Sequence, residues 1–62
     1  MRMDRAKLYT AIKAHDLQIG KVADQAGISR ATLSGILSGR ACREDTAQKI
    51  ADVLGMKLEK LM

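Results

Sequence analysis

Proline, phenylalanine and tryptophan are missing from this 62-residue sequence, and Tyr9 is its one aromatic residue. The lack of proline excludes a proline-rich spacer, and the chain shows no other linker, internal repeat or low-complexity segment. The near-absence of aromatic residues removes one group of strong strand formers. Alanine, leucine, isoleucine and methionine supply most of the apolar content, and all but isoleucine favour helix. We therefore predict an all-α chain.

Cysteine is nearly absent too, because Cys42 is the only one. A lone cysteine cannot form a disulfide within the chain, and it suits a reducing compartment. No stretch approaches the roughly 20 apolar residues of a membrane-spanning helix. Residues 1–10 also lack the apolar run of a signal peptide. We expect a soluble, cytoplasmic protein with no membrane partner.

The charge that is present is positive and unevenly spread. The net charge is +4. Four basic residues face two acidic ones in residues 1–20, four face one in residues 21–43, and three face four in residues 44–62. A positive excess over the first two-thirds of the chain is typical of proteins that bind a polyanion such as nucleic acid. From charge alone, a basic surface that binds only solvent is an equal alternative.

Apolar residues recur at helical spacing in five segments. They predict helices over residues 4–15, 19–26, 29–38, 43–54 and 57–61. Helices this short are unstable alone in water, so packing must hold them together. We predict a single compact five-helix domain over residues 1–62. Its expected core consists of Leu8, Ile12, Val22, Ala23, Leu33, Ile36, Leu37, Ile50, Leu54, Leu58 and Leu61.

Local signals mark where these helices begin and end. Asp4 and Ser29 are the residue types that cap helix N-termini. Gly27 and Gly55 follow helical segments at places where positive φ is often needed, and glycine adopts it without steric cost. The inward stripe of the first predicted helix ends at His15, which we expect at the edge of the core.

Residues 19–38 meet the requirements of a helix-turn-helix. Two helices that cross closely need a small residue in the first helix, a glycine in the turn and apolar residues at fixed positions. Seven positions, counted from Ile19, agree in register: Val22, Ala23, Ala26, Gly27, Ile28, Leu33 and Ile36. One alanine or glycine would mean little, but seven matches form a fairly specific signal.

The similarity extends beyond this motif. The segment LQIGKVADQAGISRATLSGILSG resembles helices two and three of the Xre family, the phage-repressor and Cro type of helix-turn-helix protein. The segment KIADVLGMKLEKL resembles that family's fourth helix and closing segment. Residues 8–61 align without an obvious gap. The resemblance implies a repressor-like fold that regulates transcription by binding double-stranded DNA, usually as a dimer. For so short a chain we expect a homodimer on DNA and leave a free monomer open.

The resemblance also implies which residues touch DNA. The positions that approach base edges are occupied by Ser29, Arg30, Ala31, Thr32, Ser34 and Gly35. The positions expected to contact phosphate are occupied by Gln18, Ile19, Lys21, Ser38, Arg40 and Arg43.

Two departures from the family pattern stand out. Gln18 and Ile19 replace a frequent Ser or Thr cap and a phosphate-binding Gln, so the contact must come from Gln18 or from backbone amides. Ile12 and Leu37 stand where many members have an arginine and a glutamate. Replacing a buried ion pair by apolar residues is often neutral or stabilising, so this second departure does not threaten the fold.

Arg30 is the strongest candidate for reading sequence. Its guanidinium can donate two hydrogen bonds to guanine O6 and N7, although a contact with phosphate alone stays open. Ala31 or Thr32 can place a methyl group against a thymine methyl, or can simply be helix surface. Ser34 and Gly35 lack reach, and we expect them to provide clearance for a close approach.

Other function classes find less support. No paired carboxylates, nucleophile–base pair or phosphate-cradling loop is evident, so we expect no catalytic activity, cofactor, metal site or small-molecule ligand. The main alternative is a protein-interaction module, such as an antitoxin or an antirepressor partner, that keeps the fold without reading DNA. The weak start of the second helix at Gln18 favours this alternative, whereas Arg30 and the basic loop after the third helix argue against it.

Overall fold

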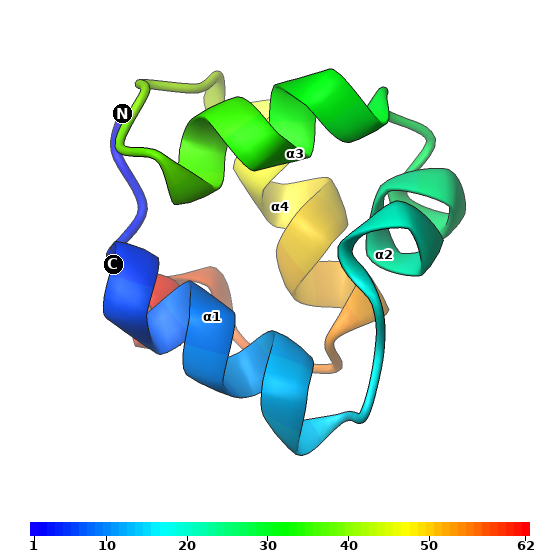
Figure 1. The fold of residues 1–62 in the computed structure, drawn as a ribbon. Helices are drawn as coiled ribbons and strands as arrows, with labels where there is room; N and C mark the ends of the chain where they lie inside the picture. Colours follow the sequence, from blue (N-terminus) through cyan, green and yellow to red (C-terminus); the bar gives the residue numbers. More distant parts are fainter.

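The computed structural model describes all 62 residues and contains only helices, turns and loops. The structure has four α-helices, which Figure 1 shows arranged around a common centre. This confirms the all-α class. The elements are α1 (Arg5–Ala14), α2 (Ile19–Ala26), α3 (Arg30–Leu37), α4 (Glu44–Val53) and the 3-10 turn η1 (Leu58–Leu61). The fifth predicted helix is thus a 3-10 turn, in which the Lys60 N–H donates to the Lys57 carbonyl at 3.0 Å. The hydrogen bond joins residues three apart, as in a 3-10 helix, rather than four apart as in an α-helix.

Side-chain caps begin two of the helices. Asp4 accepts a hydrogen bond from the Lys7 N–H at 2.9 Å, at the start of α1. Ser29 accepts from the Thr32 N–H at 3.0 Å, at the start of α3. Both predicted caps are confirmed. α2 has no side-chain cap at Gln18, so its first backbone N–H groups are not satisfied by that side chain.

All four α-helices end in the same way. The first residue after α2 and the second residue after each of the other three helices take a left-handed conformation: Asp16 (φ 54°), Gly27 (φ 71°), Gly39 (φ 102°) and Gly55 (φ 63°). Two backbone hydrogen bonds then close each end, in the pairs Asp16–Lys13 and Leu17–Ile12, Gly27–Asp24 and Ile28–Ala23, Gly39–Ile36 and Arg40–Gly35, and Gly55–Asp52 and Met56–Ala51. This is the Schellman motif, which satisfies the last carbonyl groups of a helix.

The Schellman motif also decides where the chain goes next. The residue after the left-handed one folds back over the helix, and it commonly makes an apolar contact there. Leu17, Ile28 and Met56 occupy this place after α1, α2 and α4, and all three pack against the core. Arg40 occupies it after α3 and is exposed. The ends of α1, α2 and α4 therefore each place an apolar side chain against the core, whereas the end of α3 places a cation on the surface.

The core contains 14 buried residues, all of them apolar. Nine of the eleven predicted core residues are buried, whereas Leu37 and Leu58 are half-buried and pack against the core from its edge. The prediction missed Met3, Ala11, Ala26, Ala47 and Ala51. His15 is exposed rather than at the core edge, because α1 ends at Ala14 and the backbone turns away at His15 and Asp16.

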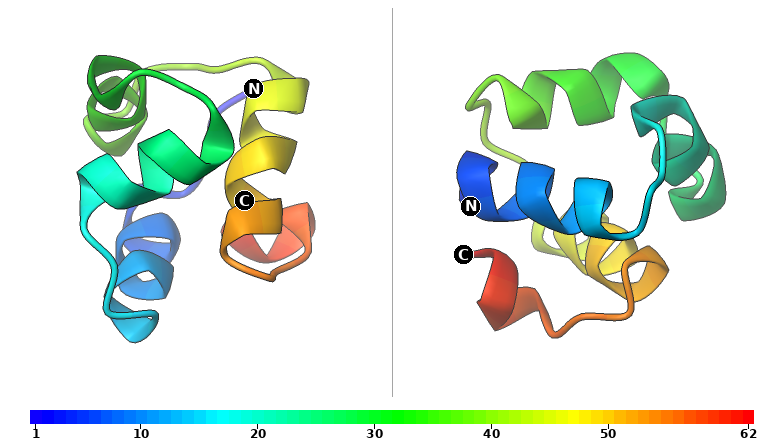
Figure 2. Two further views of the ribbon diagram at one scale, coloured as in Figure 1. Left: turned by 90° about the vertical axis from the view of Figure 1, so that its right-hand side faces the viewer. Right: turned by 60° about the horizontal axis from the view of Figure 1, so that its bottom comes forward.

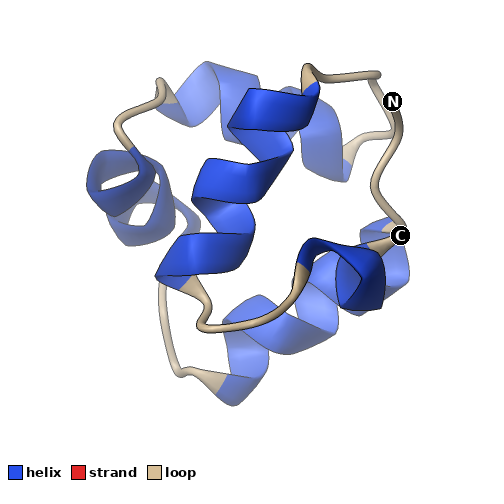
Figure 3. Ribbon diagram, turned by 180° about the vertical axis from the view of Figure 1, so that it is seen from behind, coloured by secondary structure: helices blue, strands red, loops and turns tan.

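The first residues tie distant parts of the chain together. The Cys42 N–H donates to the Met1 carbonyl at 2.7 Å, and the Met1 amino group donates to the Cys42 carbonyl at 2.9 Å. The Asp4 N–H donates to the Leu61 carbonyl at 2.8 Å. The views in Figure 2 and Figure 3 show the N-terminal segment between the loop after α3 and the C-terminal turn. This segment therefore steadies the loop that carries Arg40 and Arg43.

Replacing Gly27 by alanine tests the left-handed turn between α2 and α3. Nothing lies within 4 Å of the position that a Cβ would take, so the cost comes only from the backbone at φ 71°. We expect Gly27→Ala to lower the free energy of unfolding by about 1–2 kcal/mol and the Tm by about 4–8 °C per kcal/mol. Gly20→Ala, inside α2, is the matched control and should stabilise by roughly 0.5–1 kcal/mol. Equal melting temperatures for the two variants would contradict this role of Gly27.

Enlarging Ala23 tests the close packing of α2. Ala23 is buried with 2% of its surface exposed. Ala23→Leu adds volume to a filled core, so we expect it to lower the free energy of unfolding by about 1–3 kcal/mol. The same change at exposed Ala31 should alter stability by no more than about 0.5 kcal/mol. Urea unfolding followed by circular dichroism measures both values, and an unchanged midpoint for Ala23→Leu would show that the space around Ala23 is not filled.

Candidate nucleic-acid interface

The outer face of α3 gathers the residues predicted to read bases. Leu33 and Ile36 turn into the core, which leaves the opposite side of the helix exposed. Figure 1 shows α3 along one edge of the molecule, with α2 beside its N-terminal end. The structure places on this helix and its cap all six predicted residues: Ser29, Arg30, Ala31, Thr32, Ser34 and Gly35. Five are exposed, and Gly35 is half-buried.

Small side chains dominate the N-terminal part of this face. The hydroxyl groups of Ser29 and Thr32 lie 2.7 Å apart and share a hydrogen bond. Ser29 also caps α3, so its oxygen is engaged with the helix backbone. Only Arg30 has a long side chain in this part of α3. This part of the outer face of α3 therefore has few protruding side chains, and it carries a positive charge at the N-terminal end of the helix.

Arg30 lies back over the start of α2. A Cβ at Gly20 would be 3.7 Å from both Cζ and Nε of Arg30, an ordinary van der Waals distance. Arg30 lines a surface hollow there with Gln18, Lys21 and Asp24. Because the first N–H groups of a helix attract anions, this position is nearer to a phosphate contact than to a base contact. Base reading by Arg30 stays a prediction that requires the side chain to rotate along α3.

The other predicted phosphate contacts lie around the two ends of the helix pair. Gln18, Ile19 and Lys21 are at the start of α2. Ser38, Arg40 and Arg43 follow α3 and lead into α4. The Ser38 hydroxyl donates to the Ser34 carbonyl at 3.0 Å, so this donor is turned back toward the helix. Arg40 and Arg43 are exposed. The predicted residues thus form two groups, one on each side of the outer face of α3.

The sequence analysis missed two arginines near the end of α3. Arg2 and Arg5 line a surface hollow together with Ser38 and Gly39. A Cβ at Gly39 would lie 3.5 Å from Cδ and 3.6 Å from Nη1 of Arg5. The positive excess of residues 1–20 was the available signal, but the family resemblance begins only at residue 8. A cation in this place is favoured by the negative end of the α3 dipole.

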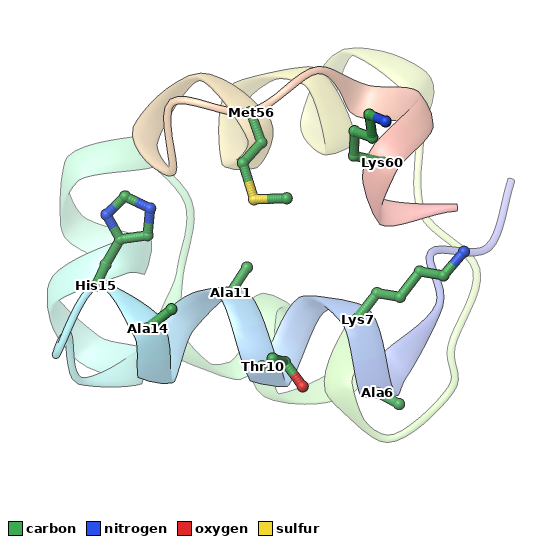
Figure 4. Close-up of a pocket in the computed structure, with 8 residues that line it drawn as sticks. All are labelled: Ala6, Lys7, Thr10, Ala11, Ala14, His15, Met56 and Lys60. Atoms are coloured by element: carbon green, nitrogen blue, oxygen red, sulfur yellow. The ribbon is translucent and has the colours of Figure 1, made fainter.

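A separate groove lies between α1 and the C-terminal segment (Figure 4). It has a volume of about 440 Å³. Its lining consists of Ala6, Lys7, Thr10, Ala11, Ala14, His15, Met56 and Lys60. The Lys7 ammonium donates to the Met62 carbonyl at 2.9 Å across one end. Figure 2 shows α1 between α3 and η1, so this groove is not part of the α3 face.

Cys42 shows no sign of a reactive thiol. It is half-buried in the loop after α3, and burial raises the pKa of the thiol, against a smaller opposite effect of the Met1 ammonium group. A raised pKa keeps the thiol protonated and a weak nucleophile. The structure brings no three His, Cys, Asp or Glu residues together as a metal site would require. It also contains no helix long and apolar enough to cross a membrane.

Solved structures with a similar arrangement include regions of longer chains. This chain is similar to a region of native PhpD with cadmium atoms, with 26% identity and a TM-score of 0.85, over 100% of this chain and 13% of that one. It is also similar to a hydroxyethylphosphonate dioxygenase variant, with 26% identity and a TM-score of 0.88, over 100% of this chain and 14% of that one. The chain therefore spans only about a seventh of these proteins.

Sequence comparison identifies the family directly. No curated protein matches this chain. The family model described as helix-turn-helix matches residues 8–61, which include the α2–turn–α3 unit, α4 and η1. These residues are nearly the whole chain, and within them α2 and α3 are joined by the short turn at Gly27. The chain therefore belongs to the Xre-type helix-turn-helix family of DNA-binding regulators.

Proposed function

We propose that this protein is a sequence-specific regulator of transcription that places α3 in the major groove of duplex DNA and acts as a repressor. The observation that carries the proposal is the outer face of α3, which has short side chains between arginines at its two ends. The major groove admits one α-helix, and short side chains allow the helix to approach closely. Repression needs only that the bound protein occupies a site, so it is the simplest regulatory outcome.

Base reading would come from the outer face of α3. Arg30 would contact a guanine, and the methyl groups of Ala31 and Thr32 would lie near thymine methyl groups. Ser29, Ser34 and Gly35 would allow the backbone to come near the base edges. The exposure of Arg30 supports the rotation that this contact needs.

Phosphate contacts would hold α3 in register. The start of α2, with Gln18, Ile19 and Lys21, faces one side of the α3 surface. Ser38, Arg40 and Arg43 lie toward the other side. Contacts of this kind fix the position of a protein on DNA and carry most of the salt dependence. In this proposal the protein binds a two-fold symmetric site as a homodimer that assembles on the DNA.

A protein-interaction module is the second candidate. The fold recurs as a small part of hydroxyethylphosphonate dioxygenase chains, so the fold alone does not establish DNA reading. We do not propose dioxygenase activity for this chain, which corresponds to about a seventh of those proteins. We propose a binding protein without catalytic activity, and the two candidates differ in whether any duplex is bound selectively.

Selection of bound duplexes from a random DNA pool tests the proposed function. We expect enrichment of paired half-sites, and half-site spacing near one helical turn, about 10 base pairs, would report the dimer. The logarithm of the affinity should fall linearly with the logarithm of the salt concentration, with a slope of about −0.9 per phosphate contact. Arg43→Ala should reduce that slope by about 1. Lys60→Ala, in the groove away from α3, removes the same charge and should leave the slope unchanged. No duplex binding at low salt would favour the interaction module.

Arg30→Ala tests base reading at the start of α3. We expect it to lower the preference for the selected duplex over a scrambled one by about 1–3 kcal/mol, because a bidentate guanine contact would be lost. Fluorescence anisotropy on both duplexes at one salt concentration measures the preference, with Lys60→Ala as the charge-matched control. An equal loss of affinity on the two duplexes would show that Arg30 contacts only phosphate.

A further inference from the structure

Gly35 lies on the outer face of α3 but is not fully exposed. It is two residues from buried Leu33, which places it about 200° away around the helix. Ala31 lies one turn earlier on the same side and is exposed, whereas Gly35 is half-buried. The covering group is the side chain of Arg40, whose Cδ would lie 3.1 Å from a Cβ at Gly35. Cγ and Nε of Arg40 would each lie 3.9 Å from the same position.

The Schellman motif at the end of α3 produces this contact. The Arg40 N–H donates to the Gly35 carbonyl at 3.0 Å, and Gly39 supplies the left-handed turn at φ 102°. A backbone hydrogen bond therefore holds residues 35 and 40 together, whatever their side chains are. In the other three motifs the corresponding pairs are apolar: Leu17 with Ile12, Ile28 with Ala23, and Met56 with Ala51. At α3 alone, an arginine lies against a residue with no side chain.

The missing side chain decides where the arginine goes. A Cβ contact of 3.1 Å is tighter than ordinary van der Waals contact, so a side chain at position 35 would displace the stem of Arg40 by a few tenths of an ångström. Gly35 lets the stem lie directly on the backbone of α3. The aliphatic part of Arg40 thus lies against Gly35, on the surface that would face base edges.

We propose that Arg40 reads a base, and that Gly35 positions it to do so. This inference rests on the proposed function, because it takes the outer face of α3 as the groove-facing surface. Arg40 was predicted from the family resemblance to contact phosphate. Its guanidinium can donate two hydrogen bonds to guanine O6 and N7, as any groove-facing arginine can. The two long cationic side chains, Arg30 and Arg40, then serve the two ends of a helix whose other outer residues are short.

A double-mutant cycle on Gly35 and Arg40 tests the inference. Wild type, Gly35→Ala, Arg40→Ala and the double variant are compared on the duplex that wild type selects and on duplexes with single substituted base pairs. We expect Arg40→Ala to lower the preference for one guanine by roughly 5- to 150-fold. Gly35→Ala should weaken binding to the selected duplex more when Arg40 is present than in the Arg40→Ala background, where only the clearance between α3 and DNA is reduced. The coupling should exceed about twofold, the lower limit for residues in contact.

Two comparisons sharpen the cycle. The Gly20–Arg30 pair is matched, since an arginine also lies over a helical glycine there, but the contact would be an ordinary 3.7 Å. We expect no coupling between Gly20→Ala and Arg30→Ala. Arg43→Ala should weaken all duplexes equally, as a phosphate contact does. Melting temperatures show whether each variant is folded. The Gly35→Ala variant should have a higher Tm than wild type, because alanine favours helix.

Two results would overturn the inference while leaving the proposed function intact. One is an equal loss of affinity on matched and substituted duplexes for Arg40→Ala, which would make Arg40 a phosphate contact. The other is the same loss for Gly35→Ala with and without Arg40, which would mean that the added methyl group meets the DNA itself. If wild type selects no sequence from the pool, the proposed function and the inference are overturned together.

Discussion

The backbone turn at the end of each helix governs the rest of this structure. A 62-residue chain with one aromatic residue must fill its core with aliphatic side chains. Its helices are too short to hold their own conformation in water. Four Schellman motifs compensate, because each satisfies the last carbonyl groups of a helix and reverses the chain onto that helix. Three of them deliver Leu17, Ile28 and Met56 to the core.

Small residues make the second contribution to packing. Five alanines are buried beside nine larger apolar residues, and they let the helices approach closely where they stand: Ala11, Ala23, Ala26, Ala47 and Ala51. The sequence analysis included only Ala23 among its core residues. Alanine favours helix wherever it stands, and its own hydrophobicity is too small to show which side of a helix is buried. Only the positions of neighbouring helices distinguish the core alanines from exposed Ala31.

The candidate interface shows why a shared fold does not by itself define a function. A similar arrangement forms part of much longer dioxygenase chains, and function resides in the residues that the fold presents. In this chain the outer face of α3 carries short side chains between two arginines, and each arginine lies against a glycine. Arg40 rests on Gly35 and Arg30 on Gly20, while Arg5 rests on Gly39. Gly27, Gly39 and Gly55 act through their positive φ, whereas at Gly35 the missing side chain makes room for the stem of Arg40.

The sequence by itself determined the features that depend on neighbours within four or five residues. The caps at Asp4 and Ser29, the turn at Gly27 and the register of the helix-turn-helix follow from local hydrogen bonds and spacing, so they could be predicted. The tertiary structure decided the rest. The type of the last turn, the exposure of His15, and the places of Arg5, Arg30 and Arg40 could not be predicted. A long flexible side chain takes its direction from the surface it meets, and that surface comes from other helices or from a turn whose geometry exists only after folding.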